Sequence, residues 1–355
     1  MTENSTLSLI KRLSVAIGVT GYSGENNIHQ AVAAEFASIA DRVEHDRLGS
    51  VVGVKFGEQP GPERRKIMLA AHLDELGAVV TKIDRGFLRF TRYGGLDNRV
   101  LMGQEVIVHG RRNLPGVIGS IPPHFAVPGH DTSAIDPQEL LIDIGLPPAD
   151  VARQVQPGDL ISFYREPAEL QNDLISGKAM DNRSSVAALV VCLQTLQNLK
   201  HQWDVYAVAT ATEEWGGGYV GAITQANAIR PDAALVVDVT FADVDEIEVK
   251  LDKGPVIALG PGNHPVIRQK LVDICRQLEL TFQSEIMPSG AGTDAYAIEV
   301  SREGVPTVLV SVPSRNMHTP VEIVSVKDVE RTGRLLAHFI SSLTDAFITE
   351  LIPAD

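Results

Sequence analysis

Apolar residues recur along the chain at two different periods, which together predict alternating strands and helices. The run Ile67-Met68-Leu69-Ala70-Ala71 has no polar break, as is typical of a strand buried on both faces of a sheet. Between Ile28 and Ile39, apolar residues recur every three or four positions, which indicates a helix with one buried face. The same criteria predict strands over Val51–Phe56, Val205–Ala211, Ala234–Val239 and Thr307–Val312, and helices over Ser184–Leu199, Val266–Leu278 and Val326–Leu351. This alternation predicts an α/β fold whose mixed, mostly parallel sheet is flanked by helices.

The segment 76–171 has a different pattern. Nine of the 20 prolines fall between Pro115 and Pro167, and the apolar stretches there are short, divided by glycine and without helical periodicity. Short strands are expected over Val79–Ile83, Phe87–Thr91, Gln104–His109, Val117–Ile121, Leu140–Ile144 and Leu160–Tyr164. We therefore expect two domains, an α/β domain built from 1–75 and 172–355, and a small all-β, barrel-like domain without helices inserted at 76–171.

The composition is that of a globular protein with an acidic surface. Of the 355 residues, 31 are Lys or Arg and 45 are Asp or Glu, which gives a formal net charge of −14. A chain this acidic repels nucleic-acid phosphates and anionic lipid, so we expect neither as a partner. No 18 apolar residues run together, and the chain does not begin like a secretion signal. We expect a cytoplasmic protein without a membrane span.

Polar residues with metal-binding side chains follow several of the predicted strands. His72 and Asp74 come directly after the continuous apolar run, and Glu213-Glu214 follow Val205–Ala211. Because ligands in open α/β sheets collect at the carboxyl ends of the strands, we expect these side chains to meet at one edge. The remaining members of the set are Asp238 at the end of Ala234–Val237, His318 after Thr307–Val312, and Asp181 just before a buried helix.

Each of these features alone has an ordinary structural explanation, but the combination indicates a metal centre. A single histidine after a strand is more often structural than a ligand, and adjacent glutamates are usually solvated. Here the two glutamates end an apolar strand, where burying both carboxylates is costly unless a cation compensates them. A carboxylate between two cations can bridge them, and a free glutamate can serve as the base for an attacking water. The residues then divide into Asp181 as the bridge, His72 and Asp238 on one metal, Glu214 and His318 on the other, Glu213 as the general base, and Asp74 behind His72. Nitrogen and oxygen ligands of this kind favour two Zn²⁺ or Co²⁺ ions over Mg²⁺.

The motifs around these positions resemble those of a known enzyme family. They are His-Leu-Asp-Glu-Leu-Gly at 72–77, Gly-Lys-Ala-Met-Asp-Asn-Arg at 177–183, Glu-Glu at 213–214, Val-Asp-Val-Thr at 237–240, Gly-Thr-Asp-Ala at 292–295 and His-Thr-Pro-Val-Glu at 318–322. This set resembles the dinuclear metallo-aminopeptidases of the glutamyl and deblocking group, and the likeness extends almost end to end. The resemblance implies the same metal ligands, Glu213 as general base, Asp74 as the orienting carboxylate, peptide substrates, and a homododecamer whose inserted domain forms dimers.

One segment departs from the family pattern, and one alternative activity uses the same metal core. The run from Glu213 to Ala222 is two residues longer than the family's usual sequence and carries extra glycines and two aromatic residues, which puts substrate specificity in doubt. We expect metal-dependent removal of N-terminal residues from short peptides. The alternative is a carboxypeptidase or N-deacylase, whose extra domain typically follows the glutamate pair. Here 109 residues separate His72 from Asp181 and only 32 separate Asp181 from Glu213, an order that favours the aminopeptidase.

Overall fold

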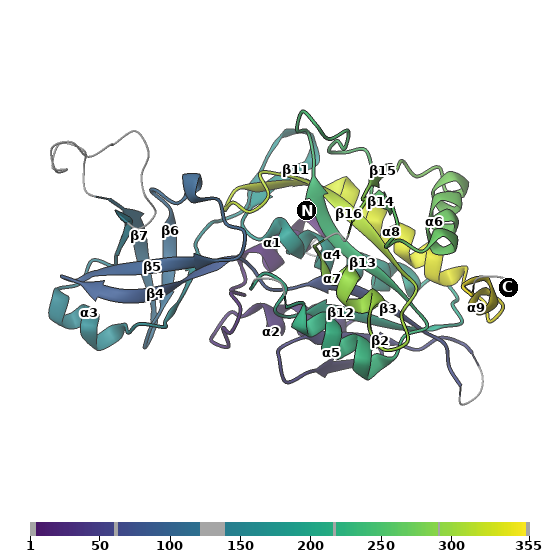
Figure 1. Cartoon of the computed structure of the whole chain (residues 1–355), viewed down its shortest axis with the longest axis horizontal. Coiled ribbons are helices and arrows are strands. Elements are labelled where there is room, and N and C mark those ends of the chain that lie inside the picture. Colours follow the sequence, from purple (N-terminus) through teal and green to yellow (C-terminus); the bar gives the residue numbers. More distant parts are fainter. Residues whose placement is uncertain (1–4, 60–62, 121–138, 216–217, 290–291, 353–355) are drawn as a thin grey trace.

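The continuous apolar run that precedes His72 forms β3 (Lys66–His72), a strand in the middle of a large mixed sheet. The structure, a computed structural model, describes residues 5–59, 63–120, 139–215, 218–289 and 292–352. Figure 1 shows two parts, an α/β domain that carries this sheet and a smaller β domain that projects from one end of it. The predicted fold class, α/β with an inserted small β domain, is confirmed.

The large sheet contains eleven described strands. Its main path runs β1 (Arg42–His45), β2 (Val51–Lys55), β12 (Asp204–Thr210), β3, β13 (Ala233–Phe241), β16 (Thr307–Arg315), β17 (Glu322–Ser325), β11 (Leu174–Gly177) and β10 (Ala168–Glu169), and β14 (Val256–Leu259) and β15 (Gln283–Ile286) extend from β16. The central strands β12, β3, β13 and β16 are all parallel, so their carboxyl ends lie at one edge of the sheet.

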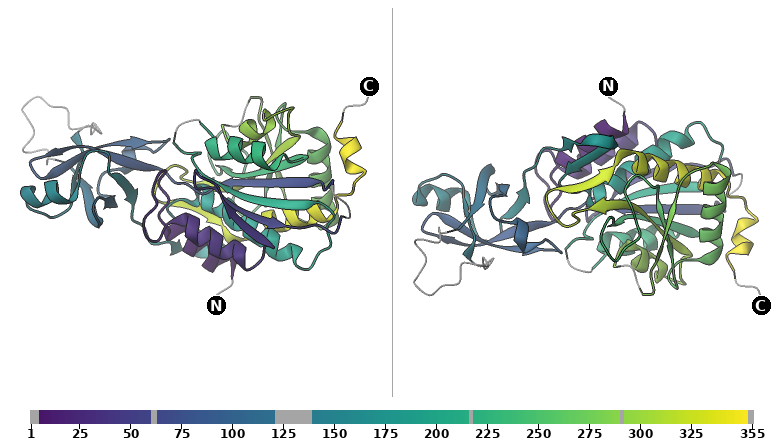
Figure 2. Two further views of the ribbon diagram at one scale, coloured as in Figure 1. Left: turned by 90° about the horizontal axis from the view of Figure 1, so that it is seen from below. Right: turned by 90° about the horizontal axis from the view of Figure 1, so that it is seen from above.

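Helices cover both faces of this sheet (Figure 2). Alternate residues of β3 enter different cores: Ile67 and Leu69 belong to the larger core, and Met68 and Ala70 to the smaller one on the opposite face. The larger core contains α1 (Thr6–Val15), α2 (Ile28–Ala37), α4 (Met180–Leu196), α6 (Pro265–Gln277) and α8 (Val326–Ser341), whereas the smaller contains α5 (Val220–Ile229) and α7 (Asp294–Glu299). A strand buried on both faces explains why its sequence does not alternate.

The inserted domain is a closed antiparallel barrel with its own apolar core. Its strands, in order around the barrel, are β4 (Gly77–Asp84), β5 (Phe87–Tyr93), β8 (Leu141–Asp143), β7 (Asn113–Gly119), β6 (Glu105–His109) and β9 (Leu160–Phe163). The expectation that this segment lacks helices is wrong, because α3 (Pro148–Gln154) and a short 3-10 turn over Asn98–Val100 occur within it. Pro148 suits the first turn of a helix, and Val151 is buried in the barrel core. The predicted strand Val117–Ile121 ends outside the described residues.

The predicted C-terminal helix Val326–Leu351 is also wrong in one respect, because it is two helices. The first, α8, ends at Ser341, and a short α9 (Phe347–Glu350) follows a turn. Trp203 donates its indole N–H to the Thr344 carbonyl in that turn, at 3.2 Å, and Phe347 packs edge-on against Phe339. These tertiary contacts bend the chain after α8, where sequence periodicity alone predicts that the helix continues. None of the described helices combines the length and apolarity needed to cross a membrane.

Candidate active site

Four parallel strands deliver most of the predicted site residues to one edge of the sheet. His72 is the last residue of β3, and it pairs with Thr210 at the end of β12, just before Glu213 and Glu214. Together with Asp181 near the start of α4, all six predicted metal-site and base residues line one cavity of about 540 Å³: His72, Asp181, Glu213, Glu214, Asp238 and His318.

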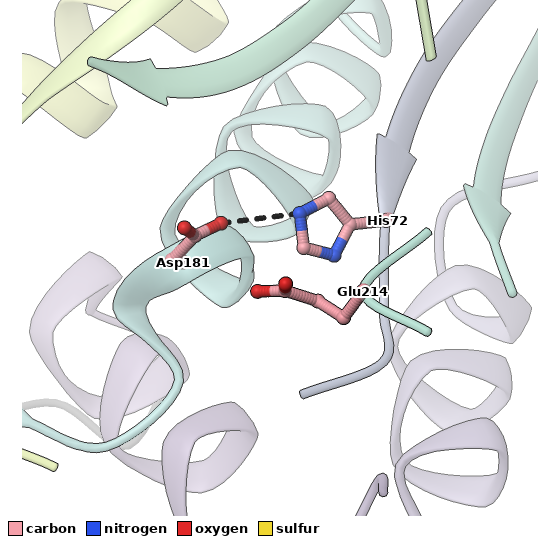
Figure 3. A group of neighbouring side chains, drawn as sticks. All are labelled: His72, Asp181 and Glu214. Carbon is pink, nitrogen blue, oxygen red and sulfur yellow. Dashed lines mark hydrogen bonds and ion pairs between the residues drawn. The ribbon is translucent and has the colours of Figure 1, made fainter. Parts of the chain in front are cut away.

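Asp181 lies between the two histidines. Its Oδ1 is 3.1 Å from His72 Nε2, and its Oδ2 is 3.5 Å from His318 Nε2. Figure 3 shows Asp181 and Glu214 directed toward the His72 ring from different elements. His72 Nε2 is also 3.8 Å from Asp238 Oδ1 and 3.9 Å from Glu213 Oε2. One oxygen of the Asp181 carboxylate thus faces His72 and the other faces His318, as expected of a bridging ligand.

Two groups hold Asp181 in this position. The Asp181 backbone N–H donates to Glu322 Oε2 at 2.9 Å, and the Asn182 amide donates to the Val237 carbonyl, beside Asp238, at 2.9 Å. The other Glu322 oxygen accepts the backbone N–H of His318 at 2.8 Å. Glu322 therefore ties the bridge position to the second histidine. Sequence reasoning quoted this residue as part of a motif without assigning it a role.

Asp74 supports the glutamate pair more directly than it supports His72. Its carboxylate accepts the backbone N–H groups of Glu213 and Glu214, at 3.0 and 3.1 Å, and the Thr20 hydroxyl at 2.8 Å. His72 Nδ1 lies 3.3 Å from the Asp74 backbone carbonyl but 3.8 Å from its carboxylate, which is too long for a hydrogen bond. The side chain predicted to orient the histidine is thus placed to orient the general-base candidate.

The inserted domain contacts the site at His318. Nδ1 of this histidine lies 3.2 Å from the Gly95 carbonyl, and the His318 carbonyl accepts the Asp97 N–H at 3.2 Å. A donor proton on Nδ1 leaves Nε2, which faces Asp181, as the ligand atom. A Cβ on Gly95 would stand 2.4 Å from that Nδ1, so the close approach requires glycine.

The site carries more negative charge than its own residues can balance. Burial raises the pKa of Glu213 to about 9 and that of Asp238 to about 7, and it raises the pKa of Glu214 well above its ordinary value. Burial alone would lower the pKa of His72, but the negative charge of Glu213, Asp181 and Asp238 raises it well above the ordinary value. Among the described residues, the two histidines are the side chains that form ion pairs with Asp181, Asp238 and Glu213.

The donor set fits divalent metal ions. Ligand atoms of His72, Asp181 and Glu214 lie within 4.8 Å of one another, and so do those of His72, Glu213 and Asp238. Among the described residues, buried Glu214 Oε1 has no hydrogen-bond partner, which is costly unless an ion or water meets it. The second group contains Glu213, the predicted base, and His318 joins the set through Asp181.

Sequence reasoning assigned no role to one buried acid near this site. Asp294, in the Gly-Thr-Asp-Ala motif, is 2% exposed and accepts the Thr210 hydroxyl, while its Oδ1 has no described partner. Burial raises its pKa to about 6. In the longer loop, Tyr219 lines the cavity and Trp215 is exposed, whereas the extra glycines Gly216 and Gly217 lie outside the described residues.

An open sheet whose central strands are parallel, with imidazoles and carboxylates gathered at their carboxyl ends, is typical of a hydrolase of the metallopeptidase type. Residues 49–335 match the model of the M42 glutamyl aminopeptidase family, and the chain belongs to this family. The resemblance proposed from the motifs, and with it the prediction of an aminopeptidase, is confirmed.

Relatives and solved structures cover nearly the whole chain. A lysyl aminopeptidase of Pyrococcus furiosus is 32% identical and covers 98% of each chain. The structure of an aminopeptidase from the archaeon Desulfurococcus kamchatkensis has a TM-score of 0.88 at 35% identity and covers 98% of both chains. The TET1 peptidase of Pyrococcus horikoshii has a TM-score of 0.82 at 30% identity, covers 96% of this chain and 100% of its own, and assembles into a tetrahedron or a large octahedral shell.

Proposed function

We propose that the protein removes N-terminal residues from short peptides at this cavity, with two divalent metal ions, Zn²⁺ or Co²⁺, as its cofactors. The single observation that carries the proposal is Asp181, whose two carboxylate oxygens face His72 and His318 separately. A carboxylate in that position would suit a ligand shared by the two ions of a two-metal hydrolytic site.

The proposed ligand sets are those expected from the sequence. His72 and Asp238 would hold one ion, Glu214 and His318 the other, with Asp181 shared between them. When bound, the two ions supply Lewis-acid polarisation of the scissile carbonyl and acidify a water. The unpaired buried oxygen of Glu214 and the raised pKa values of Glu214 and Asp238, which arise from burial, support these assignments.

Glu213 is proposed as the general base. Its side chain is 11% exposed, so it faces the cavity from an almost buried position, and its backbone is fixed by Asp74. Glu213 takes a proton from the attacking water and gives it to the leaving amine. A glutamate whose pKa burial has raised above its ordinary value is suited to hold that proton between the two steps.

The charges on the cavity wall favour an aminopeptidase over a carboxypeptidase. A carboxypeptidase must bind the substrate's terminal carboxylate, for which Arg or Lys is the usual partner. Among the described residues that line the cavity, the basic side chains are His72 and His318, and both face Asp181. The carboxylate-rich wall suits a free α-amine instead.

Self-association through the inserted domain forms the second part of the proposal. The Pyrococcus horikoshii relative can assemble into a tetrahedron or a large octahedral shell. We propose that the barrel at 76–171 forms the dimer contact and that the assembly is a homododecamer, which would admit only short or unfolded peptides. Exposed Val117 and Tyr164, which line one hollow on the barrel, support a contact there. Sedimentation that shows a stable monomer would contradict this part.

Glu213→Gln tests the role of the base. Hydrolysis of aminoacyl-p-nitroanilides by the Zn²⁺- or Co²⁺-loaded variant should fall by roughly 10²–10⁴-fold, the usual contribution of a general base. Metal content measured by mass spectrometry should stay unchanged. Glu303→Gln, at a glutamate that is 85% exposed, serves as the matched control. Near-normal activity in Glu213→Gln would refute the assignment.

A further inference from the structure

One carboxylate on the cavity wall belongs to none of the proposed metal sets. Glu285, on β15, lines the cavity and is half-buried. The Thr240 hydroxyl donates to Glu285 Oε2 at 2.7 Å, which holds the side chain toward β13. Within the described part of the chain, no Lys or Arg forms an ion pair with Glu285, so its negative charge is available to a ligand.

The position of Thr240 relates Glu285 to the proposed metal centre. Thr240 and Asp238 are two residues apart on β13, so both side chains leave the same face of the strand, about 6–7 Å apart. Asp238 Oδ1 is 3.8 Å from His72 Nε2. Glu285 is therefore hydrogen-bonded to the residue that lies next to the proposed ligand Asp238 on the same face of β13. A substrate whose α-amine is held at the proposed metal site would reach the Glu285 carboxylate with a first side chain that has a four-carbon stem.

Apolar side chains line part of the same cavity. They are Phe241, Met287 and Leu309. Lysine and arginine side chains combine an apolar stem with a cationic tip, so they can pack methylenes on such a wall and present the charge at its end. A glutamate or aspartate side chain in the same place would meet Glu285 with like charge.

We propose that Glu285, oriented by Thr240, selects substrates whose N-terminal residue is lysine or arginine. This inference rests on the proposed aminopeptidase function and specifies its substrate class. A charged pair confined within a partly enclosed cavity favours the basic side chain, whereas an acidic first residue is rejected by repulsion. Glu285 acts on specificity and has no part in the proton transfers assigned to Glu213.

The test compares kcat/KM for Lys-, Arg-, Leu- and Glu-p-nitroanilide, using the metal-loaded full-length protein. The wild type should prefer Lys and Arg. In Glu285→Gln, which keeps the side-chain length and an acceptor for Thr240, kcat/KM for the Lys substrate should fall by about 10–100-fold, as for loss of a hydrogen bond between charged groups. The value for the Leu substrate should change by less than about threefold. Glu285→Lys should move the preference toward the Glu substrate, and Glu303→Gln should leave all four values unchanged.

The outcomes separate this inference from the function on which it rests. Hydrolysis of the Leu substrate without an advantage for Lys or Arg would overturn the role of Glu285 and leave the aminopeptidase standing. Equal losses for the Lys and Leu substrates in Glu285→Gln would also overturn it, because they would indicate a structural role. An enzyme that hydrolyses none of the four substrates, with any of Zn²⁺, Co²⁺ or Mn²⁺, would overturn the proposed function and this preference with it.

Discussion

The two histidines of the site occupy contrasting environments. The His72 side chain is 2% exposed, ends a strand in the middle of the sheet, and lies within 4 Å of carboxylate oxygens of Asp181, Asp238 and Glu213. The His318 side chain is 33% exposed, follows β16 in a loop, and has a positive φ of 65°. One half of the site, around His72, is thus enclosed, and the other, around His318, is open.

The difference shows how the two domains share the site. The enclosed half is built wholly from the α/β domain. On the open half, by contrast, His318 rests on the carbonyl of Gly95, which belongs to the inserted domain, and on Glu322 through its backbone. The insert therefore contacts a proposed metal ligand directly.

Alanine at each histidine tests this contrast most severely. His72→Ala should weaken metal affinity roughly tenfold more than His318→Ala, on the scale by which metal-site partners usually contribute. Water can replace the half-exposed His318 ring, whereas it cannot easily fill the enclosed position of His72. Titration with Zn²⁺ or Co²⁺ under a competing chelator measures both affinities. Equal losses would remove the distinction between the two halves.

Gly95→Ala tests whether the insert controls the open half. The new Cβ would lie 2.4 Å from His318 Nδ1 and force the ring to move. We expect kcat/KM to fall about 10–100-fold, as for other displaced supports of a metal ligand, with little change in thermal stability. Gly119→Ala is the matched control, since its Cβ would meet nothing within 4 Å. Unchanged kinetics in Gly95→Ala would show that His318 does not depend on the insert.

The pH dependence of the metal-free protein sharpens the description of the enclosed half. Burial raises the pKa of Glu213 from 4.5 to about 9. The folded state therefore favours protonated Glu213. The stability that this protonated group contributes is fully present below about pH 4.5 and is lost as the pH rises through about 9. Metal-free Glu213→Gln, which cannot ionise, should melt a few degrees above the metal-free wild type at pH 9. This difference in melting temperature should shrink toward pH 5, and added Zn²⁺ should reduce it. A constant gap in thermal melts across this range would contradict the enclosed environment.

Much of the site could be predicted from the sequence because parallel strands place their ends together. His72, Glu213, Glu214, Asp238 and His318 were accessible for this reason, because each follows a predicted strand. Asp181 was found as a carboxylate just before a predicted buried helix. Asp74 shows the limit. Its spacing from His72 suggested contact with the ring, but the turn after β3 directs its carboxylate to the backbone N–H groups of Glu213 and Glu214. Turn geometry decides that direction, and periodicity does not report it.

By itself, the sequence determined the α/β class, the inserted barrel and the residues able to bind metal, because burial on two faces and metal-ligand chemistry leave local signals. Only the tertiary structure decided which partners each group meets. Gly95 supports His318 across 223 positions of chain, and Thr240 holds Glu285 across 45. Contacts at such separations depend on how strands and domains pack in three dimensions, and the residues next to each position in the sequence do not indicate that packing.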